Sequence, residues 1–470
     1  MSRRRIPPEK RLIQDITITD IAEEGKGVGK AEDLVLFVDK AIPGDVVDVE
    51  LTRKKKNFAE ARIVQLKTDS PHRIKPFCDH FGVCGGCKWQ HMEYPAQLTY
   101  KQNSVANALS RLGKVDTSRM EAILPAPETT YYRNKLEYTF SNKRWLTQVD
   151  DEQAATEMNA LGFHVPGRFD KILDVDHCYL QQDPSNAIRN RLRAFALAEQ
   201  ISFYDLRQHE GALRNLIIRT ASTGELMVIV VFAYADAETV QKTMAFLQEE
   251  FPQVTSLLYI LNQKKNDTIF DQDIHLFAGR DHIFEEMEGL RFKIGAKSFY
   301  QTNSQQAYAL YQITRDFAAF EGHERVYDLY TGAGTIANFI AGHVQEVIGV
   351  EYVPTAIEDA KINSAVNGIA NTKFFAGDMK DVLTPDFIAE HGKPDVVITD
   401  PPRAGMHADV VARLLEMEAG KIVYVSCNAA TQARDLALLQ EKYEVVRIRP
   451  VDMFPQTQHV ENVVLLKLKG

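Results

Sequence analysis

Strands and helices that alternate from about residue 303 to the C-terminus constrain the fold of this chain more than any other feature. Short β-branched runs such as RVYDLY, EVIGVEY and KIVYVSCN are separated by segments of helical periodicity. Parallel strands need crossover connections, usually helices, so this rhythm predicts a doubly wound α/β domain with a mostly parallel sheet. At 470 residues the chain is too long for one core, which places further domains before this one.

Two other regions precede the α/β segment. Residues 12–67 carry short β-branched runs between Gly, Asp and Pro turns, which favours a small, five-stranded OB-like β-barrel. Further on, runs such as LIIRTAS and GELMVIVVFAY around a helix near residues 238–250 favour an α+β region with an antiparallel sheet. The acidic stretch 148–157 within it is expected to form an exposed loop. The predicted division is a barrel over residues 1–70, a central α+β domain over 71–300 and an α/β domain over 301–470.

The charge of the chain is uneven along its length. The formal net charge is −9, whereas residues 1–76 carry a small excess of positive charge. Overall acidity argues weakly against a nucleic-acid partner, while the first segment could carry either a basic face or ordinary surface charge. Within it, the RKKKN tip with Phe58 places cations beside an aromatic ring, as in barrels that bind single-stranded nucleic acid. A solvated hairpin tip has the same composition.

Hydropathy and the N-terminal residues indicate the compartment. No apolar run is long enough to span a bilayer, and the basic N-terminus MSRRRIPPEKR lacks the apolar stretch of a secretory signal. We therefore expect a cytoplasmic protein without membrane attachment, whose cysteines stay reduced.

Three of the five cysteines crowd into one loop, FCDHFGVCGGCKW. Its glycines let the backbone wrap closely, so Cys78, Cys84 and Cys87 could converge on one centre with the distant Cys178 as a fourth ligand. Four thiolates satisfy either a tetrahedral zinc or a cubane iron–sulfur cluster. One close pair with two distant singles favours the cluster, because structural zinc sites usually show two close pairs. Unliganded buried thiols remain the alternative, and a radical S-adenosylmethionine enzyme is disfavoured because it needs an iron with an open position.

Acidic residues stand at the ends of successive predicted strands. The DLYTGAGT turn follows one strand and opens a helix, and its Gly332 and Gly334 permit close approach of a ligand. Glu351, Asp378 and Asp400 end the next strands, at the edge where open α/β sheets bind ligands, and Glu351 could accept the hydroxyls of a ribose. The turn has neither a phosphate-binding lysine nor a full GxGxxG motif. This favours a nucleoside without phosphates, S-adenosylmethionine rather than NAD.

Cys427 follows the apolar run KIVYVS, and Glu461 lies on a later strand. C5 of a pyrimidine is a poor nucleophile until a thiolate adds at C6, and a base must remove the C5 proton after methyl transfer. A cysteine at a strand end facing a methyl donor would supply the thiolate, with Glu461 as the base. Arg403 in TDPPRAG replaces the aromatic residue of amino-methylating enzymes, which favours a ring carbon as the target. Strand-end cysteines in apolar runs are often inert, so the residues alone leave Cys427 open between a nucleophile and a buried thiol.

Several longer motifs occur together with the cysteine loop and the barrel: SFYQTN, DLYTGAGT, DPPRAG, SCNAATQARDL and HVENV. In this combination the chain resembles, over nearly its whole length, bacterial RNA uracil-5-methyltransferases of the subgroup that acts on 23S ribosomal RNA. That subgroup carries an N-terminal TRAM domain and a four-iron, four-sulfur [4Fe-4S] cluster. The resemblance implies a Rossmann-like S-adenosylmethionine methyltransferase domain behind a TRAM barrel. It also implies methylation of C5 of a uridine in 23S ribosomal RNA.

The resemblance further assigns roles to residues. It implies that Cys427 is the nucleophile at C6 and that Glu461 is the base that takes the C5 proton. The residues that would contact S-adenosylmethionine are Gln301, Tyr330, Thr335, Glu351, Asp378 and Asp400. The residues that would ligate the cluster, and leave it no open iron, are Cys78, Cys84, Cys87 and Cys178. The chain departs from the family pattern at Ala429, where proline is frequent after SCN, and at Thr331 and Thr335, where Cys and Asn are frequent.

We expect a monomer with RNA as its partner. The target uridine must leave its stack to reach Cys427, so a single-stranded or loop uridine is the expected substrate, with Arg133 and Lys135 available to its phosphates. One alternative is uridine methylation in transfer RNA, although that subgroup typically lacks the barrel and the cluster. The other is a non-catalytic iron–sulfur RNA-binding assembly factor, which the presence of both Cys427 and Glu461 disfavours.

Overall fold

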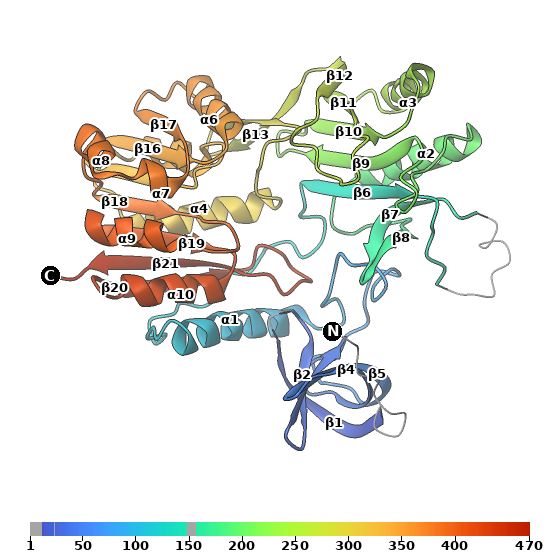
Figure 1. Ribbon diagram of the computed structural model, residues 1–470, viewed down its shortest axis with the longest axis horizontal. Helices are drawn as coiled ribbons and strands as arrows, with labels where there is room; N and C mark the ends of the chain where they lie inside the picture. The colour runs from blue at the N-terminus through green and yellow to red at the C-terminus, as the bar shows by residue number, and fades with distance from the viewer. Residues whose placement is uncertain (1–11, 23, 148–156) are drawn as a thin grey trace.

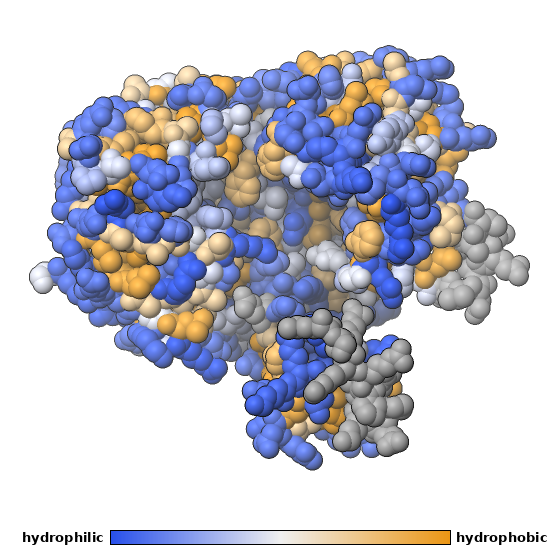
Figure 2. Space-filling model, viewed as in Figure 1, coloured by the Kyte–Doolittle hydropathy of each residue, from blue (hydrophilic) through white to orange (hydrophobic). Residues whose placement is uncertain are grey.

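Three parts of the chain surround the middle of the molecule in the computed structural model, which describes residues 12–22, 24–147 and 157–470. Figure 1 shows a barrel below, a sheet covered by helices at the left and a second sheet at the right. The surface is hollowed where the three parts meet (Figure 2). The basic N-terminal residues and, apart from Glu157, the acidic stretch expected to form an exposed loop lie outside the described residues.

The N-terminal part is a closed five-stranded barrel with the order β1-β2-β3-β5-β4, as predicted. Alternate side chains such as Leu36 and Val38 point inward and form its core. Gly29 on β2 must lack a side chain, because a Cβ atom there would lie 2.6 Å from Ile16 Cγ2 on β1. The strands are β1 (Leu12–Ile21), β2 (Gly27–Ala31), β3 (Leu34–Asp39), β4 (Val46–Lys54) and β5 (Phe58–Thr68).

The segment after the barrel is fastened to the C-terminal part. Helix α1 (Tyr94–Arg111) packs along α10 (Ala429–Leu439). The chain then runs beside β20 (Tyr443–Val451), with parallel bridges at Met120 and Leu124. We propose that this segment folds with the C-terminal domain, although the sequence assigns it to the central domain that begins at residue 71.

The central part is a seven-stranded sheet with the order β12-β11-β10-β9-β6-β7-β8. Its pairs are antiparallel except β10 with β11, because helix α3 (Ala237–Glu250) crosses over between these two strands. Helices α2 (Ser185–Ala198) and α3 lie on one face, where Phe195 stacks on Phe246 with ring centroids 4.1 Å apart. The predicted antiparallel sheet is therefore confirmed apart from one pair. The strands are β6 (Lys135–Ser141), β7 (Ala160–Val165), β8 (Arg168–Asp174), β9 (Leu213–Thr220), β10 (Leu226–Phe232), β11 (Ser256–Leu261) and β12 (Ile274–Gly279).

The C-terminal part is a seven-stranded sheet with the order β17-β16-β15-β18-β19-β21-β20. β21 runs antiparallel to both of its neighbours, and the other pairs are parallel. The chain order reverses between β15 and β18, which creates a switch point where open α/β sheets bind ligands. The predicted doubly wound α/β fold is confirmed. The remaining strands are β15 (Arg325–Leu329), β16 (Glu346–Glu351), β17 (Thr372–Ala376), β18 (Val396–Thr399), β19 (Lys421–Ser426) and β21 (Glu461–Leu468).

Helices cover both faces of this sheet. α4, α5 and α6 share a buried cluster with Val347 and Ile398, while α1, α9 and α10 pack with Ile348 and Val397 on the other face. The helices not yet introduced are α4 (Ser304–Ala318), α5 (Thr335–Ala341), α6 (Pro354–Val366), α7 (Met379–Val382), α8 (Pro385–His391) and α9 (Ala408–Met417). Within the described residues, no helix combines the length and apolar character that crossing a membrane requires.

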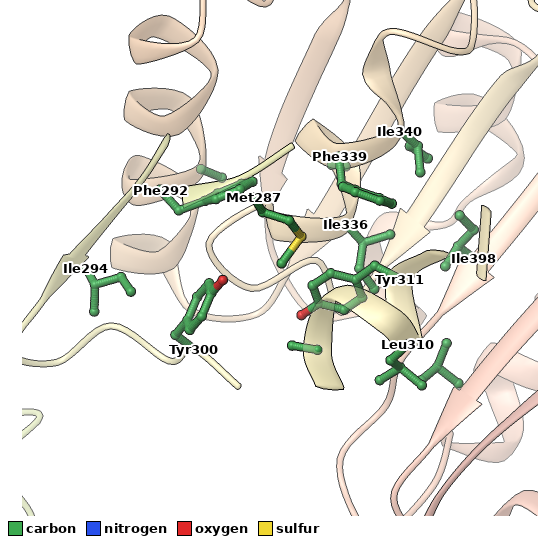
Figure 3. Packing of buried hydrophobic residues seen from close by; sticks show 14 of the residues in the cluster. Met287, Phe292, Ile294, Tyr300, Leu310, Tyr311, Ile336, Phe339, Ile340 and Ile398 are labelled. Atoms are coloured by element: carbon green, nitrogen blue, oxygen red, sulfur yellow. The ribbon is translucent and has the colours of Figure 1, made fainter. Parts of the chain in front are cut away.

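A hairpin joins the central part to the C-terminal part. β13 (His282–Met287) pairs with β14 (Leu290–Gly295). Figure 3 shows Met287 of this hairpin beside Phe339 of α5 and Tyr311 of α4. The same buried cluster also includes residues of β9, β10 and β11, but the backbone N–H of Lys293 on β14 donates to the Asn363 side chain of α6 at 2.7 Å, so we propose that the hairpin folds with the C-terminal part. The sequence predicts a boundary further along the chain, at residue 300.

Candidate active site

The carboxyl ends of the parallel strands in the C-terminal sheet bring most of the predicted site residues together. Asp328 lies on β15 and Asp400 directly follows β18, on the two sides of the switch point. Cys427 directly follows β19, and Glu461 begins the antiparallel β21, so both lie at the same edge. In Figure 1 this edge faces the middle of the molecule.

Cys427 and Glu461 stand at the neighbouring ends of adjacent strands, because Ser426 of β19 pairs with Asn462 of β21. Burial, and then the charge of Asp400, raise the pKa of the Glu461 carboxyl to about 8. Burial, followed by the charges of Glu461 and Asp400, raises the pKa of the Cys427 thiol to about 11. The guanidinium of Arg403 opposes both shifts. Arg403 therefore favours the anionic forms of the two groups that the chemistry requires.

Cys427 sits on a turn whose backbone is held on both sides. Asn428 caps α10 by accepting a backbone hydrogen bond at 3.0 Å, and its side-chain amide donates to the Arg403 carbonyl at 3.2 Å. The backbone N–H of Asn428 donates to the Ser426 hydroxyl at 3.1 Å. Ala429 is the first residue of the helix, a position that suits proline. The Asn428 cap and the Ser426 contact thus hold the turn without the proline that is frequent there.

Two aspartates flank the switch point, and the sequence motifs single out only Asp400. Although part of Asp400 touches solvent, the packing around its carboxyl group, and then the charge of Asp328, raise its pKa to about 7. Burial raises the pKa of Asp328 to about 7, against a hydrogen bond that Thr331 donates at 2.5 Å. The other carboxylate oxygen of Asp328 is buried and makes no hydrogen bond of good geometry in the described structure, although the backbone of Ala337 lies near enough to the carboxylate to lower its pKa; this oxygen can accept from a ligand that donates a hydrogen bond. The sequence could have indicated Asp328 as a site residue, because it lies on the strand directly before the glycine turn.

The glycine turn and Glu351 form one wall of the site. Glu351 accepts hydrogen bonds from the backbone N–H of Gly332 at 3.2 Å and of Val353 at 2.9 Å. Gly332 has a φ of +55°, and the space that a Cβ atom would fill there is open, so a ligand can approach the backbone. Thr335 follows as the first residue of α5 and is buried.

The remaining predicted cofactor residues lie around this wall. Burial, and then nearby carboxylates with Asp378 first, raise the pKa of Tyr330 to about 12. Asp378 itself caps α7 by accepting from the Lys380 N–H at 3.2 Å. Gln301 lies on the segment that enters α4, where its backbone carbonyl accepts from the Asn134 side chain at 2.8 Å. The structure thus places the predicted residues at the sheet edge, except Gln301, which lies on an adjoining segment.

Residues 452–460, which we call the Glu461 loop, connect β20 to Glu461. The Lys101 ammonium and the Asp452 carboxylate form an ion pair at 2.5 Å in which both side chains are fully buried. The Tyr94 hydroxyl donates to the same carboxylate at 2.8 Å. Both partners come from α1, so this helix holds the loop that leads to the base. No sequence motif indicates this pairing, because 351 residues separate the two ends of the ion pair.

The two residues expected to touch RNA phosphates differ in their surroundings. The guanidinium of Arg133 lies over the ring of Phe454 in the Glu461 loop, 5.2 Å from its centroid, and therefore close to the site. Lys135 begins β6 and is half-buried, and this burial lowers its pKa.

The four predicted cluster ligands line one pocket. Cys78, Cys84 and Cys87 come from the loop after the barrel, and Cys178 follows β8. Burial raises the pKa of Cys84 to about 12 and that of Cys87 to about 11, and neighbouring cysteines add to both shifts. Within the described residues, no three His, Cys, Asp or Glu side chains are arranged as ligands of one metal ion. Four thiols therefore share one largely apolar pocket.

Comparison with known proteins identifies the family. A family profile described as tRNA (uracil-5-)-methyltransferase matches residues 218–469, and a TRAM domain profile matches residues 9–64. The chain belongs to the tRNA (uracil-5-)-methyltransferase family. An RNA methyltransferase of Bacteroides thetaiotaomicron is 58% identical over 454 residues, which cover 96% of this chain and 100% of that protein. One of Chlorobaculum tepidum is 38% identical over 472 residues, 98% of each chain.

A solved structure agrees with this family. The crystal structure of Pyrococcus abyssi tRNA (uracil-54, C5)-methyltransferase in complex with S-adenosyl-L-homocysteine has a TM-score of 0.76 at 29% identity, and covers 97% of this chain and 100% of that one. The predictions of a TRAM barrel and a Rossmann-like methyltransferase domain are confirmed. This chain is therefore an RNA (uracil-5-)-methyltransferase that uses S-adenosylmethionine. The alternative of a non-catalytic assembly factor finds no support.

Proposed function

We propose that the protein methylates C5 of a uridine in 23S ribosomal RNA, with Cys427 as the nucleophile and Glu461 as the base. One observation carries the mechanism. The thiol and the carboxylate stand on adjacent strands, at the edge where Asp328, Asp400 and Glu351 also gather. A reacting uracil at this edge would lie close to a nucleophile, to a base and to the wall formed by the glycine turn and Glu351.

The reaction needs both side chains as anions. Cys427 adds to C6 of the uracil, and the displaced electron pair makes C5 nucleophilic. Bound S-adenosylmethionine supplies the methyl group, which C5 takes as the bond from that carbon to the donor sulfur breaks. Glu461 then removes the proton from C5, and its electron pair restores the C5–C6 double bond and expels Cys427. Arg403 lowers the pKa of both residues and so supports the step that each of them performs.

We propose that S-adenosylmethionine lies along the wall formed by the glycine turn and Glu351. The open space at Gly332 and the buried Asp328 oxygen support this placement. Glu351, fixed by two backbone hydrogen bonds, would accept the ribose hydroxyls. The residues proposed to contact the cofactor are Gln301, Tyr330, Thr335, Glu351, Asp378 and Asp400.

We further propose that Cys78, Cys84, Cys87 and Cys178 ligate a structural [4Fe-4S] cluster. The shared pocket and the donor set of four thiols support this assignment. The positive iron centres would counter the burial that raises the pKa values of these thiols, because metal binding deprotonates its ligands. We also propose that the protein acts in the cytoplasm as a monomer.

Transfer RNA is the second candidate substrate. The barrel and the cysteine pocket support ribosomal RNA in our proposal. However, a methyltransferase of tRNA uracil-54 covers 97% of this chain, barrel included, so the barrel alone does not separate the two substrates. Methyl transfer from labelled S-adenosylmethionine to purified 23S ribosomal RNA and to bulk transfer RNA, both from a deletion strain, decides between them. Labelling of transfer RNA alone would overturn the ribosomal substrate.

The mechanism is tested by trapping. An RNA substrate with 5-fluorouridine at the target position cannot lose a proton from C5, so the covalent adduct should accumulate. We expect the adduct on a denaturing gel with the wild-type protein and its absence with Cys427→Ala. An adduct that forms equally well without Cys427 would contradict the assigned nucleophile.

A further inference from the structure

A second open pocket lies far along the chain from the catalytic residues, between the barrel and the cysteine loop. Its walls come from three segments: Lys40 and Asp69 at the ends of barrel strands, residues 73–76 of the following linker, and Phe81, Gly82 and His91 around the cysteine loop. In Figure 1 these segments run between the barrel and the central sheet. The reaction proposed above uses none of these residues.

His91 is the observation that points to a ligand. Its side chain lines the pocket and is 4% exposed, yet neither ring nitrogen makes a hydrogen bond of good geometry in the described structure; the backbone of Lys40 lies near enough to the ring to favour its charged form. Burial, and then the charge of Arg73, lower its pKa to about 4. The ring is therefore neutral at neutral pH and presents one donor and one acceptor. Buried polar groups are nearly always paired, so these two atoms suit a partner that brings the complementary acceptor and donor.

Aromatic, apolar and cationic side chains line the rest of the pocket together. The ring of Phe81 lies 5.1 Å from that of His91, and Ile74 and Pro76 add apolar surface. The side chain of Lys40 extends over Gly82, with its Nζ 3.4 Å from the place a Cβ atom would take there. Neither Lys40 nor Lys75 has an ion-pair partner among the described residues, whereas Arg73 is paired with Asp45. The pocket therefore keeps two cations for an anionic ligand, against one carboxylate, Asp69.

The walls of this pocket are fixed relative to one another. The Trp89 indole donates to the Gly25 carbonyl of the barrel at 3.2 Å, and Trp89 packs with Ile42 and Met92 in a small core between the barrel and α1. Arg73 donates to the Lys40 carbonyl at 3.2 Å, which ties the linker to the barrel. A preformed pocket loses little entropy when a ligand enters it.

We propose that this pocket binds an unpaired nucleotide of the RNA substrate, away from the uridine that is methylated. The base would lie against Phe81 with its polar edge on His91, and its phosphates would lie at Lys40 and Lys75. Bases that stack on aromatic rings beside basic side chains are the usual way in which proteins hold single-stranded nucleic acid. The proposal rests on an RNA substrate, and it assigns the barrel and the cysteine loop a shared role in holding that RNA.

The first test measures binding apart from catalysis. The probe is fluorescein-labelled decauridine, titrated by anisotropy against the Cys427→Ala full-length protein without S-adenosylmethionine. We expect Lys75→Glu to weaken binding and to flatten the dependence of log K on log salt by about 0.7 for each phosphate that the variant no longer neutralises. Lys393→Glu is the matched control, because Lys393 is exposed before β18, at the opposite edge of the C-terminal sheet. An unchanged salt slope in Lys75→Glu, or no binding by the parent protein at low salt, would overturn the proposal.

The second test asks whether His91 reads a base. His91→Phe keeps an aromatic ring and removes both nitrogens, so we expect roughly two- to tenfold weaker binding of decauridine. Binding of an abasic ribose-phosphate decamer should stay unchanged. Equal losses for both probes would contradict a base in this pocket.

A photocrosslink keeps the proposal testable if His91→Phe does not fold. Decauridine with one 4-thiouridine is irradiated with the parent protein, and the crosslinked peptides are identified by mass spectrometry. We expect crosslinks within residues 69–91, and a map without this segment would overturn the proposal. Binding and crosslinking need no methyl transfer, so a protein that binds here without methylating RNA would contradict the proposed function and leave this inference standing.

Discussion

Two kinds of cysteine site in this molecule share a residue type and differ in their surroundings. Cys427 lies half-buried at the end of β19, with the carboxylates of Glu461 and Asp400 and the guanidinium of Arg403 near it. Cys84 lies in the pocket after the barrel, among the other predicted cluster ligands and apolar side chains. Burial is the main cause that raises the pKa of both thiols. The two sites differ in the charges nearby: carboxylates and a guanidinium act on Cys427, whereas other cysteines act on Cys84.

The difference teaches what each thiol needs in order to ionise. Cys427 has a cation beside it, and one reacting thiolate is formed and released in each cycle. The thiolates of the pocket would repel one another, so they need a positive centre that holds all of them at once. A substitution at Cys427 should therefore change chemistry and spare the fold, and one at Cys84 should do the reverse.

The largest expected effect comes from replacing cysteine by alanine at each of the two sites in turn. Cys427→Ala should lower methylation on the order of 10⁴-fold or more, because no other group supplies the C6 nucleophile. Its thermal midpoint should stay within a few degrees of the wild type. Cys84→Ala should lose bound iron and unfold at a lower temperature, while methylation measured well below that temperature falls far less. Equal losses of activity in the two variants would show that the sites are not separate in function.

The next effect distinguishes the nucleophile from the base within the active site. Glu461→Gln keeps the shape of the side chain but cannot take the C5 proton, so turnover should fall roughly 10²- to 10⁴-fold. Cys427 still adds in this variant, and the methylated adduct should accumulate as labelled methyl groups that stay with the protein on a denaturing gel. Glu444→Gln, on the exposed side of β20, is the control and should behave as the wild type. Loss of turnover without the adduct would assign Glu461 to an earlier step.

Local sequence patterns predicted much of the fold and of the candidate site. The features that they did not predict depend on contacts between segments that are distant in the sequence. The strand rhythm and the glycine turn placed Cys427, Glu351 and Asp400 at one sheet edge, because carboxyl ends of parallel strands meet there. Asp328 was within reach of the same reasoning. The packing of α1 on α10 and the parallel pairing of β10 with β11 depend on tertiary contacts that periodicity does not report.

The pairing of Lys101 with Asp452 belongs to these distant contacts, and it offers the third prediction. Lys101→Met removes one partner of a fully buried ion pair, which should lower the free energy of unfolding by about 3–5 kcal/mol in urea titrations. The double variant Lys101→Met/Asp452→Asn should recover part of this loss. Methylation should fall because the Glu461 loop loses one of its anchors on α1, whereas bound iron should not change. Lys242→Met, which breaks an exposed ion pair with Glu199, should change stability by less than about 1 kcal/mol.

The smallest expected effect comes from Arg403, whose charge lowers the pKa of both Cys427 and Glu461. The reacting forms of Cys427 and Glu461 are both deprotonated, and their pKa values are about 11 and about 8, so kcat/KM should rise with pH between pH 6 and pH 9. Arg403 lowers both pKa values, so Arg403→Ala should move this rise to higher pH and reduce the rate at pH 7 by about tenfold. Arg413→Ala on α9 removes a half-buried guanidinium that pairs with Glu416 and should leave the profile in place. A uniform loss at every pH in Arg403→Ala would show that Arg403 acts by contact with RNA, because a charge that works through the pKa values must shift the profile.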